Sequence, residues 1–138
     1  MSEPRAPVVG DYVRNLGRVL RVEEIPPPPQ PPPKTVYVVE QVLAQIEIHS
    51  ASGVLIDKRS AYSDFYGEGT AVPEAAAQAA ILADCLGPGV VVIVRRIVTE
   101  EHAIAGRGKN YYAPEFIALD HNKEGDQISD EIVWRSDA

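Results

Sequence analysis

The sequence predicts an α+β protein, in which a mostly antiparallel sheet of about six strands carries one main Ala-rich helix. Several runs of β-branched residues are separated by turn-forming residues, which is typical of strands. A single Ala-rich segment, residues 73–86, has the start and stop signals of a helix. The chain of 138 residues is 45% hydrophobic and 24% charged, as in globular proteins, so we expect residues 1–138 to form a single domain.

Charge and cysteine content exclude several classes of protein. The formal net charge is −7, which argues against binding to duplex DNA or to an anionic membrane surface. The last 24 residues carry −5 of this charge, so residues 120–138 are predicted to form an acidic tail. The one cysteine excludes an intrachain disulfide and a Cys-rich zinc site.

The start of the chain and its composition bear on location and source. The first residues have no apolar signal region, and the run at residues 90–94 is too short to cross a membrane, so we expect a cytoplasmic protein. Arg outnumbers Lys nine to four among the basic residues, which is typical of high-GC bacterial or phage sequences.

The N-terminal region predicts a hairpin over residues 10–25. Gly17 suits the left-handed position of a three-residue loop at residues 15–17, and Leu20 and Val22 then share one face. The run Gly-Asp-Tyr-Val-Arg, followed by Gly-Arg-Val-Leu-Arg-Val-Glu, resembles the opening hairpin of small SH3-like barrels. This resemblance implies an SH3-like barrel elaborated by the helix as one specific version of the fold.

Residues 26–33 hold seven of the twelve prolines, which predicts extended polyproline II. Such a segment is either a ligand for an SH3- or WW-type groove or a stiff connector, and we interpret it as a connector between two strands. Residues 35–49 alternate apolar and polar positions with many β-branched residues, which favours a strand. The spacing of Val39, Val42, Leu43 and Ile46 leaves a helix as the alternative.

The middle of the chain predicts a second hairpin, a loop and the helix. Residues 50–53 turn into a strand at residues 54–58, and residues 60–72 are predicted to be a loop because their three aromatic side chains have no periodicity. The helix over residues 73–86 begins at Pro73 and stops at Gly87-Pro88. Its predicted buried stripe consists of small or apolar side chains: Ala77, Ala80, Ile81 and Cys85.

The last third of the chain predicts a strand pair and a tail. Residues 90–99 read as a central strand buried on both faces, and residues 111–119 as its antiparallel partner. The Gly-bearing connection between them, residues 100–110, is expected to be mobile. The acidic tail at residues 120–138 is predicted as either a short docked helix or a strand.

Catalytic and metal sites are not indicated, and we predict a protein that is not an enzyme and needs no cofactor. Cys85 lies at the end of the helix, where the helix dipole and apolar packing disfavour a thiolate. No Gly-x-Ser-x-Gly elbow occurs in the sequence. His102 and His121 are expected at opposite ends of the predicted strand pair, and His49 is expected to be exposed, so no metal site is predicted.

The candidate binding residues lie near the end of the chain. Gly106-Arg-Gly-Lys109 lacks the spacing of a phosphate loop. Two cations nevertheless stand beside two aromatic residues here, a combination that suits an anion, a stacked base or a protein contact. The candidates are Arg107, Lys109, Tyr111 and Tyr112, together with Trp134 in the acidic tail, because Trp, Tyr and Arg are frequent interface hot spots.

These observations favour a small non-enzymatic binding or inhibitor-type protein of bacterial or phage origin that acts through protein–protein contacts. One alternative is a small-ligand or nucleotide-binding protein that takes an anionic ligand. The other is a structural subunit of a phage-type assembly, and a homo-oligomer is compatible with each.

Overall fold

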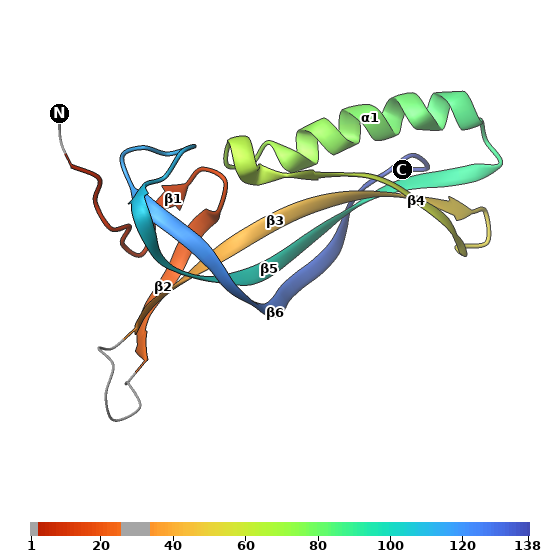
Figure 1. Ribbon diagram of the computed structural model, residues 1–138. Coiled ribbons are helices and arrows are strands. Elements are labelled where there is room, and N and C mark those ends of the chain that lie inside the picture. Colours follow the sequence, from red (N-terminus) through yellow and green to blue (C-terminus); the bar gives the residue numbers. More distant parts are fainter. Residues whose placement is uncertain (1–2, 26–33) are drawn as a thin grey trace. The chain divides into compact units, whose positions relative to one another are not determined.

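The computed structural model describes residues 3–25 and 34–138 (Figure 1). Within them the chain forms six strands, one α-helix and a short 3-10 helix at Asp64–Tyr66. The fold is α+β and its sheet is mostly antiparallel, as the sequence predicts. In chain order, the elements are β1 (Tyr12–Val13), β2 (Gly17–Ile25), β3 (Lys34–Ser50), β4 (Leu55–Ser63), α1 (Ala71–Leu86), β5 (Val90–Lys109) and β6 (Ile117–Arg135).

The strands of the described residues follow the order β1-β2-β3-β5-β6, and β4 pairs with β3 beside this path. The sheet is open, because β1 and β6 stand at the two ends of the order. The resemblance to an SH3-like barrel is therefore not confirmed. The predicted polyproline connector, residues 26–33, lies outside the described residues.

The chain divides into two compact units. Unit 1 consists of residues 1–41 and 99–126, and unit 2 of residues 42–98 and 127–138. Strands β3, β5 and β6 each contribute residues to both units. That residues 1–138 unfold as a single domain stays a prediction.

The core of unit 2 lies between α1 and the sheet (Figure 1). Ala71, Ala75 and Ala79 are fully buried on the inner face of the helix. They pack with sheet residues that include Ala44 and Val92, and alanine lets the helix approach the strands closely. The inner face is completed by partly buried Val72, Leu82 and Ala83.

The predicted buried stripe of the helix is wrong. Ala77, Ala80, Ile81 and Cys85 all lie on the exposed face, with Ile81 58% exposed. Because α1 is apolar on both faces, its periodicity does not choose which face the sheet covers. The expected burial of the Cys85 thiol is wrong for the same reason.

The orientation of α1 is set at its start. The buried carboxylate of Asp64 accepts hydrogen bonds from the backbone N–H of Gly69 and of Ala71, at 2.9 Å each. This ties the first turn of the helix to the 3-10 turn that follows β4, and a carboxylate is also favourable near the positive end of the helix dipole. Ala71 is held at the sheet as a result.

Two predictions for the first half of the chain are settled by β3 and β4. Residues 35–49 are a strand and not a helix, and the hairpin at residues 50–58 is confirmed. The predicted loop at residues 60–72 is partly wrong, because β4 continues to Ser63 and pairs there with Leu43. Tyr62, one of the aromatic residues of this segment, packs against the core of unit 2 although the segment has no apolar periodicity.

Unit 1 has a smaller core built by its hairpin and by the turn after β5. The β1–β2 hairpin is confirmed, and Asn15 and Gly17 both adopt positive φ there. Gly17 is required, since a Cβ at this position would lie 1.9 Å from the backbone oxygen of Glu40.

The core of unit 1 consists of Val13, Val19, Val39, Ala113 and Phe116. Val19 enters this core, whereas Val22, which was predicted to share a face with Leu20, is 40% exposed.

The C-terminal strands are longer than predicted. The buried central strand at residues 90–99 is confirmed, with Val92, Ile93 and Val94 buried in succession. The connection expected at residues 100–110 is wrong, because β5 continues to Lys109; the mobility expected of these residues stays a prediction. The turn therefore lies at residues 110–116, and the predicted partner strand at residues 111–119 begins only at Ile117.

The acidic tail is a strand and not a helix. β6 runs to Arg135, and Ser136 exchanges hydrogen bonds with the backbone of Val92 at 2.9 Å in both directions. The C-terminal end of the tail thus docks on the core of unit 2. Among the residues described, no helix is long and apolar enough to span a membrane.

Candidate functional site

The turn between β5 and β6, residues 110–116, carries two of the predicted binding residues and is here called the tyrosine loop. Its first residue, Asn110, is buried. Asn110 Oδ1 accepts hydrogen bonds from the backbone N–H of Tyr112 at 2.9 Å and of Ala113 at 3.1 Å. Such a side-chain cap is the usual role of Asn at the start of a turn, and it fixes the backbone that carries both tyrosines.

Phe116 and Arg5 hold the far end of the tyrosine loop. Phe116 is buried in the core of unit 1, and Asn110 N–H donates to its carbonyl oxygen at 2.9 Å. Arg5 bridges the adjoining strand, accepting from Ile117 N–H and donating its own N–H to the Glu115 oxygen, at 3.0 Å each. The Arg5 guanidinium also stacks over the Phe116 ring, 4.6 Å from its centre. The loop is therefore fixed at both ends.

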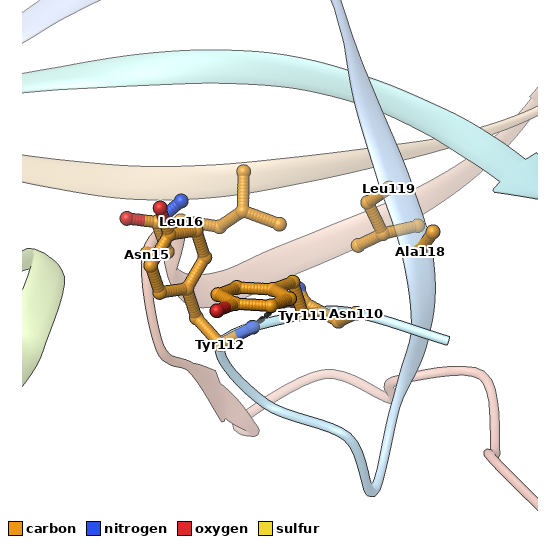
Figure 2. Close-up of a pocket in the computed structure, with 7 residues that line it drawn as sticks. All are labelled: Asn15, Leu16, Asn110, Tyr111, Tyr112, Ala118 and Leu119. Carbon is orange, nitrogen blue, oxygen red and sulfur yellow. Dashed lines mark hydrogen bonds between the residues drawn. The ribbon is translucent and has the colours of Figure 1, made fainter. Parts of the chain in front are cut away.

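The two tyrosine rings are presented to solvent beside a cavity. Tyr111 is 88% exposed and Tyr112 is 44% exposed, and their rings meet edge to face with centres 5.1 Å apart. The cavity, of about 200 Å³, lies between the β1–β2 turn, the tyrosine loop and the start of β6. Figure 2 shows the residues that line it: Asn15, Leu16, Asn110, Tyr111, Tyr112, Ala118 and Leu119.

The predicted cations stand next to this cavity in the chain. Lys109 directly precedes Asn110, and Arg107 lies two residues earlier at the end of β5; both are exposed. Arg14, which directly precedes the lining residue Asn15, is exposed as well. We call Arg14, Arg107 and Lys109 the rim cations. Within residues 3–25 and 34–138, none of their side chains forms an ion pair or hydrogen bond.

The structure does not bring Trp134 to this site. Trp134 belongs to unit 2, where it is partly buried and packs against the core beneath α1. The cluster that it packs against includes Val92, whose backbone is hydrogen bonded to Ser136. The tyrosine loop and the rim cations are therefore the candidate site, and Trp134 supports the fold of the other unit.

Unit 2 contains a buried carboxylate that sequence reasoning missed. Glu47, only 4% exposed, accepts hydrogen bonds from Arg95 Nε and Nη2 at 3.3 Å each, and His49 Nε2 lies 2.9 Å from its Oε1. Arg95 also donates to Asp130 at 3.1 Å. Burial alone raises the pKa of Glu47, but the hydrogen bonds from His49 and Arg95 outweigh it and lower the pKa below its usual value.

This arrangement corrects one expectation and argues for a structural role. His49 was expected to be exposed, yet its side chain is 17% exposed and bonded to Glu47. Both oxygens of Glu47 accept hydrogen bonds from neighbouring side chains, as expected of a carboxylate that is buried for structural reasons. The group stabilises the sheet of unit 2.

The other two histidines lie on paired strands of unit 1. Arg21 donates to both oxygens of Glu100, at 2.7 and 3.1 Å, and thereby lowers the pKa of that carboxyl; His102 lies 3.7 Å from the same group. His121 contacts the neighbouring residue Glu101. The expectation that the two histidines stand at opposite ends is thus wrong, because the strand pair is longer than predicted. No cluster in the described part of the chain has the residues to hold a metal ion.

Sequence analysis identified the two tyrosines and two cations of the site but not the other residues that line the cavity. Asn15 and Leu16 come from a hairpin almost a hundred positions away in the chain, so only pairing of the strands reveals them. Asn110 could have been found, since an Asn before two aromatic residues and Ala-Pro is a turn signal. No family model matches the chain, and no curated protein or solved structure does either.

Proposed function

We propose that this is a small non-enzymatic binding protein that contacts a protein partner through the tyrosine loop. The observation that carries the proposal is the exposure of Tyr111 and Tyr112, at 88% and 44%, on a loop whose two ends are fixed. Tyrosine supplies a large contact area at low cost in side-chain entropy and is enriched at interface hot spots.

The fixed backbone favours tight binding. Ordering a free loop on association costs free energy, which reduces affinity. Here the cap by Asn110 and the burial of Phe116 order the tyrosine loop before a partner arrives. The exposed rings then add contact area without that cost.

The size of the cavity supports a protein partner over a nucleotide. Sites for drug-sized ligands usually enclose roughly 300–1,000 Å³. The cavity beside the tyrosine loop holds about 200 Å³, which suits one side chain of a partner better than a base with its sugar and phosphate. A small-molecule ligand remains the alternative class.

Affinity capture tests the proposal. The protein is immobilised and exposed to lysate of its source, and retained proteins are compared between wild type, Tyr111→Ala/Tyr112→Ala and Phe65→Ala. Phe65 is a matched control because it is also exposed, at 37%, but lies in unit 2. We expect one partner to be retained by wild type and the control and lost with the tyrosine variant, while the melting temperatures of both variants stay close to that of wild type.

Other results would favour other functions. Equal capture by the tyrosine variant would reject the tyrosine loop as the interface. A melting temperature that rises with a nucleotide panel would favour the small-ligand class, since a ligand that binds only the native state stabilises it. Growth into large rings with concentration would favour a structural subunit, and catalytic turnover lost on changing a histidine would show an enzyme.

A further inference from the structure

From the charges around the tyrosine loop we infer the chemistry of its partner: an extended acidic segment that inserts one apolar or aromatic side chain into the cavity. This inference rests on the proposed function, because it assigns the ligand of the same site. It depends on three observations, namely the unpaired rim cations, the uncharged lining of the cavity and its size.

The rim cations set the sign of the partner's charge. The protein has a net charge of −7, and other arginines of unit 1 are neutralised: Arg5 pairs with Asp11 at 2.9 Å, and Arg21 pairs with Glu100 at 2.7 Å. Arg14, Arg107 and Lys109 have no such partner among the residues that the structure describes. Unpaired cations beside an interface attract acidic groups and speed their association.

The acidic residue of the tyrosine loop, Glu115, and the next one along the chain, Asp120, do not neutralise the rim cations. The charge of Glu115 acts on Arg5, and the carboxylate of Asp120 lies against Gly106, which leaves no room for a Cβ there. Neither carboxylate forms an ion pair with a rim cation within the described residues. An acidic ligand therefore meets a cationic rim although the whole protein is acidic.

The lining of the cavity decides what enters it. Its lining consists of the apolar residues Leu16, Ala118 and Leu119, the two tyrosines, and the uncharged polar residues Asn15 and Asn110 (Figure 2). No charged side chain lines it, so a carboxylate or a phosphate placed inside would be desolvated without a counter-charge. An apolar or aromatic side chain fits the wall, and acidic neighbours on either side of it reach the rim cations.

Random copolymers test this chemistry on the full-length protein. The probes are poly(Glu,Tyr), poly(Lys,Tyr), poly-Glu and a single-stranded oligothymidylate. Binding is followed by calorimetry at low and high salt, and by NMR shifts of the Tyr111, Tyr112 and Leu119 amides. We expect poly(Glu,Tyr) to bind most tightly, to shift these amides and to weaken at high salt, while poly(Lys,Tyr) does not bind.

Two charge-matched variants separate a local effect from a general one. Arg14→Gln/Arg107→Gln/Lys109→Gln removes the rim cations, whereas the control Lys58→Gln/Arg59→Gln/Arg135→Gln removes three cations of unit 2. We expect the rim variant to weaken poly(Glu,Tyr) binding about tenfold or more, and the control to weaken it less than about twofold.

Several results would overturn the acidic-partner inference. These are equal binding of both tyrosine copolymers, equal loss in the two charge variants, and binding of oligothymidylate in preference to poly(Glu,Tyr), which would show a nucleic-acid site. Failure here is distinct from failure of the proposed function. If capture is lost in Tyr111→Ala/Tyr112→Ala but unchanged in the rim variant, the tyrosine loop is the interface and its partner is not acidic.

Discussion

The two units differ in where their charged and aromatic side chains lie and in whether these side chains have partners. In unit 2, helix α1 covers the sheet and the buried Glu47 is surrounded by His49 and Arg95. In unit 1, the described residues form strands and turns, and the tyrosine loop exposes two rings beside cations without partners. The same sheet strands supply both units, so the difference lies in what is packed on them and what is left at their turns.

The comparison separates stability from recognition. Burial of apolar area and satisfaction of buried charge are what stabilise a fold, and the buried, hydrogen-bonded carboxylates of Glu47 and Asp64 both lie in unit 2. Unpaired cations and exposed aromatic rings contribute little to folding but are available to a partner. We therefore expect substitutions in unit 2 to change the free energy of unfolding, and substitutions at the tyrosine loop to change binding.

The largest expected effect on the free energy of unfolding distinguishes one arginine of unit 2 from one arginine of unit 1. Arg95→Met leaves the buried Glu47 carboxylate without its main counter-charge, and should lower the free energy of unfolding by about 3 kcal/mol. Arg21→Met removes a pair whose arginine is 44% exposed, and should cost about 1 kcal/mol or less. Urea titration of both variants measures the two costs, and equal costs would contradict the distinction between the units.

A smaller effect tests which face of α1 is covered. Ala75→Leu places extra volume between the helix and the sheet and should lower the free energy of unfolding by about 2 kcal/mol. Ala77→Leu adds the same atoms on the exposed face and should change it by less than about 0.5 kcal/mol. The reverse order in thermal unfolding would mean that the outer face is the buried one.

Acid tests the buried carboxylate. Because the pKa of Glu47 is lower in the folded state, its charge stabilises the fold above its unfolded pKa of about 4.3, and this contribution is lost as the pH falls from there through the lower folded value. The slope that one proton contributes is at most about 1.4 kcal/mol per pH unit. Glu47→Gln should therefore show a shallower loss of stability below pH 5 than wild type.

The control for the acid measurement is Glu124→Gln. Glu124 is exposed, and its side chain forms no hydrogen bond or ion pair in the part of the chain that the structure describes. Its slope against pH should match that of wild type. A Glu47→Gln profile that also matches wild type would show that this carboxyl is not stabilised by His49 and Arg95 in solution.

The smallest expected effect on stability concerns the cap of the tyrosine loop. Asn110→Ala removes the acceptor of two backbone N–H groups and should cost about 1 kcal/mol. Hydrogen exchange should become faster at the amides of Tyr112 and Ala113, while the amides of α1 keep their protection. Unchanged exchange at the loop would show that Phe116 and Arg5 alone hold it.

Local chemistry by itself determined much of the secondary structure. The β-branched residues of 35–49 and 90–99 favour extended conformations, and the alanines of 73–86 have the highest helix propensity. Gly17, Gly53 and Gly87, all at positive φ, mark turns or ends that the sequence signals directly. The two tyrosines and two of the three rim cations were also recognisable in the sequence as candidate binding residues, without knowledge of the fold.

Only the tertiary structure decided which side chains meet. Helix α1 is apolar on both faces, so its periodicity does not determine which face is buried. The hydrogen bonds of Asp64 and the space available at the sheet bury Ala75 and leave Ala77 exposed. The length of the β5–β6 pair was equally hidden, because the polar residues of 100–109 gain their hydrogen bonds from the neighbouring strand and not from their own composition. For the same reason the cavity, in which Asn15 and Leu16 lie beside the tyrosine loop, exists only once distant turns are brought together.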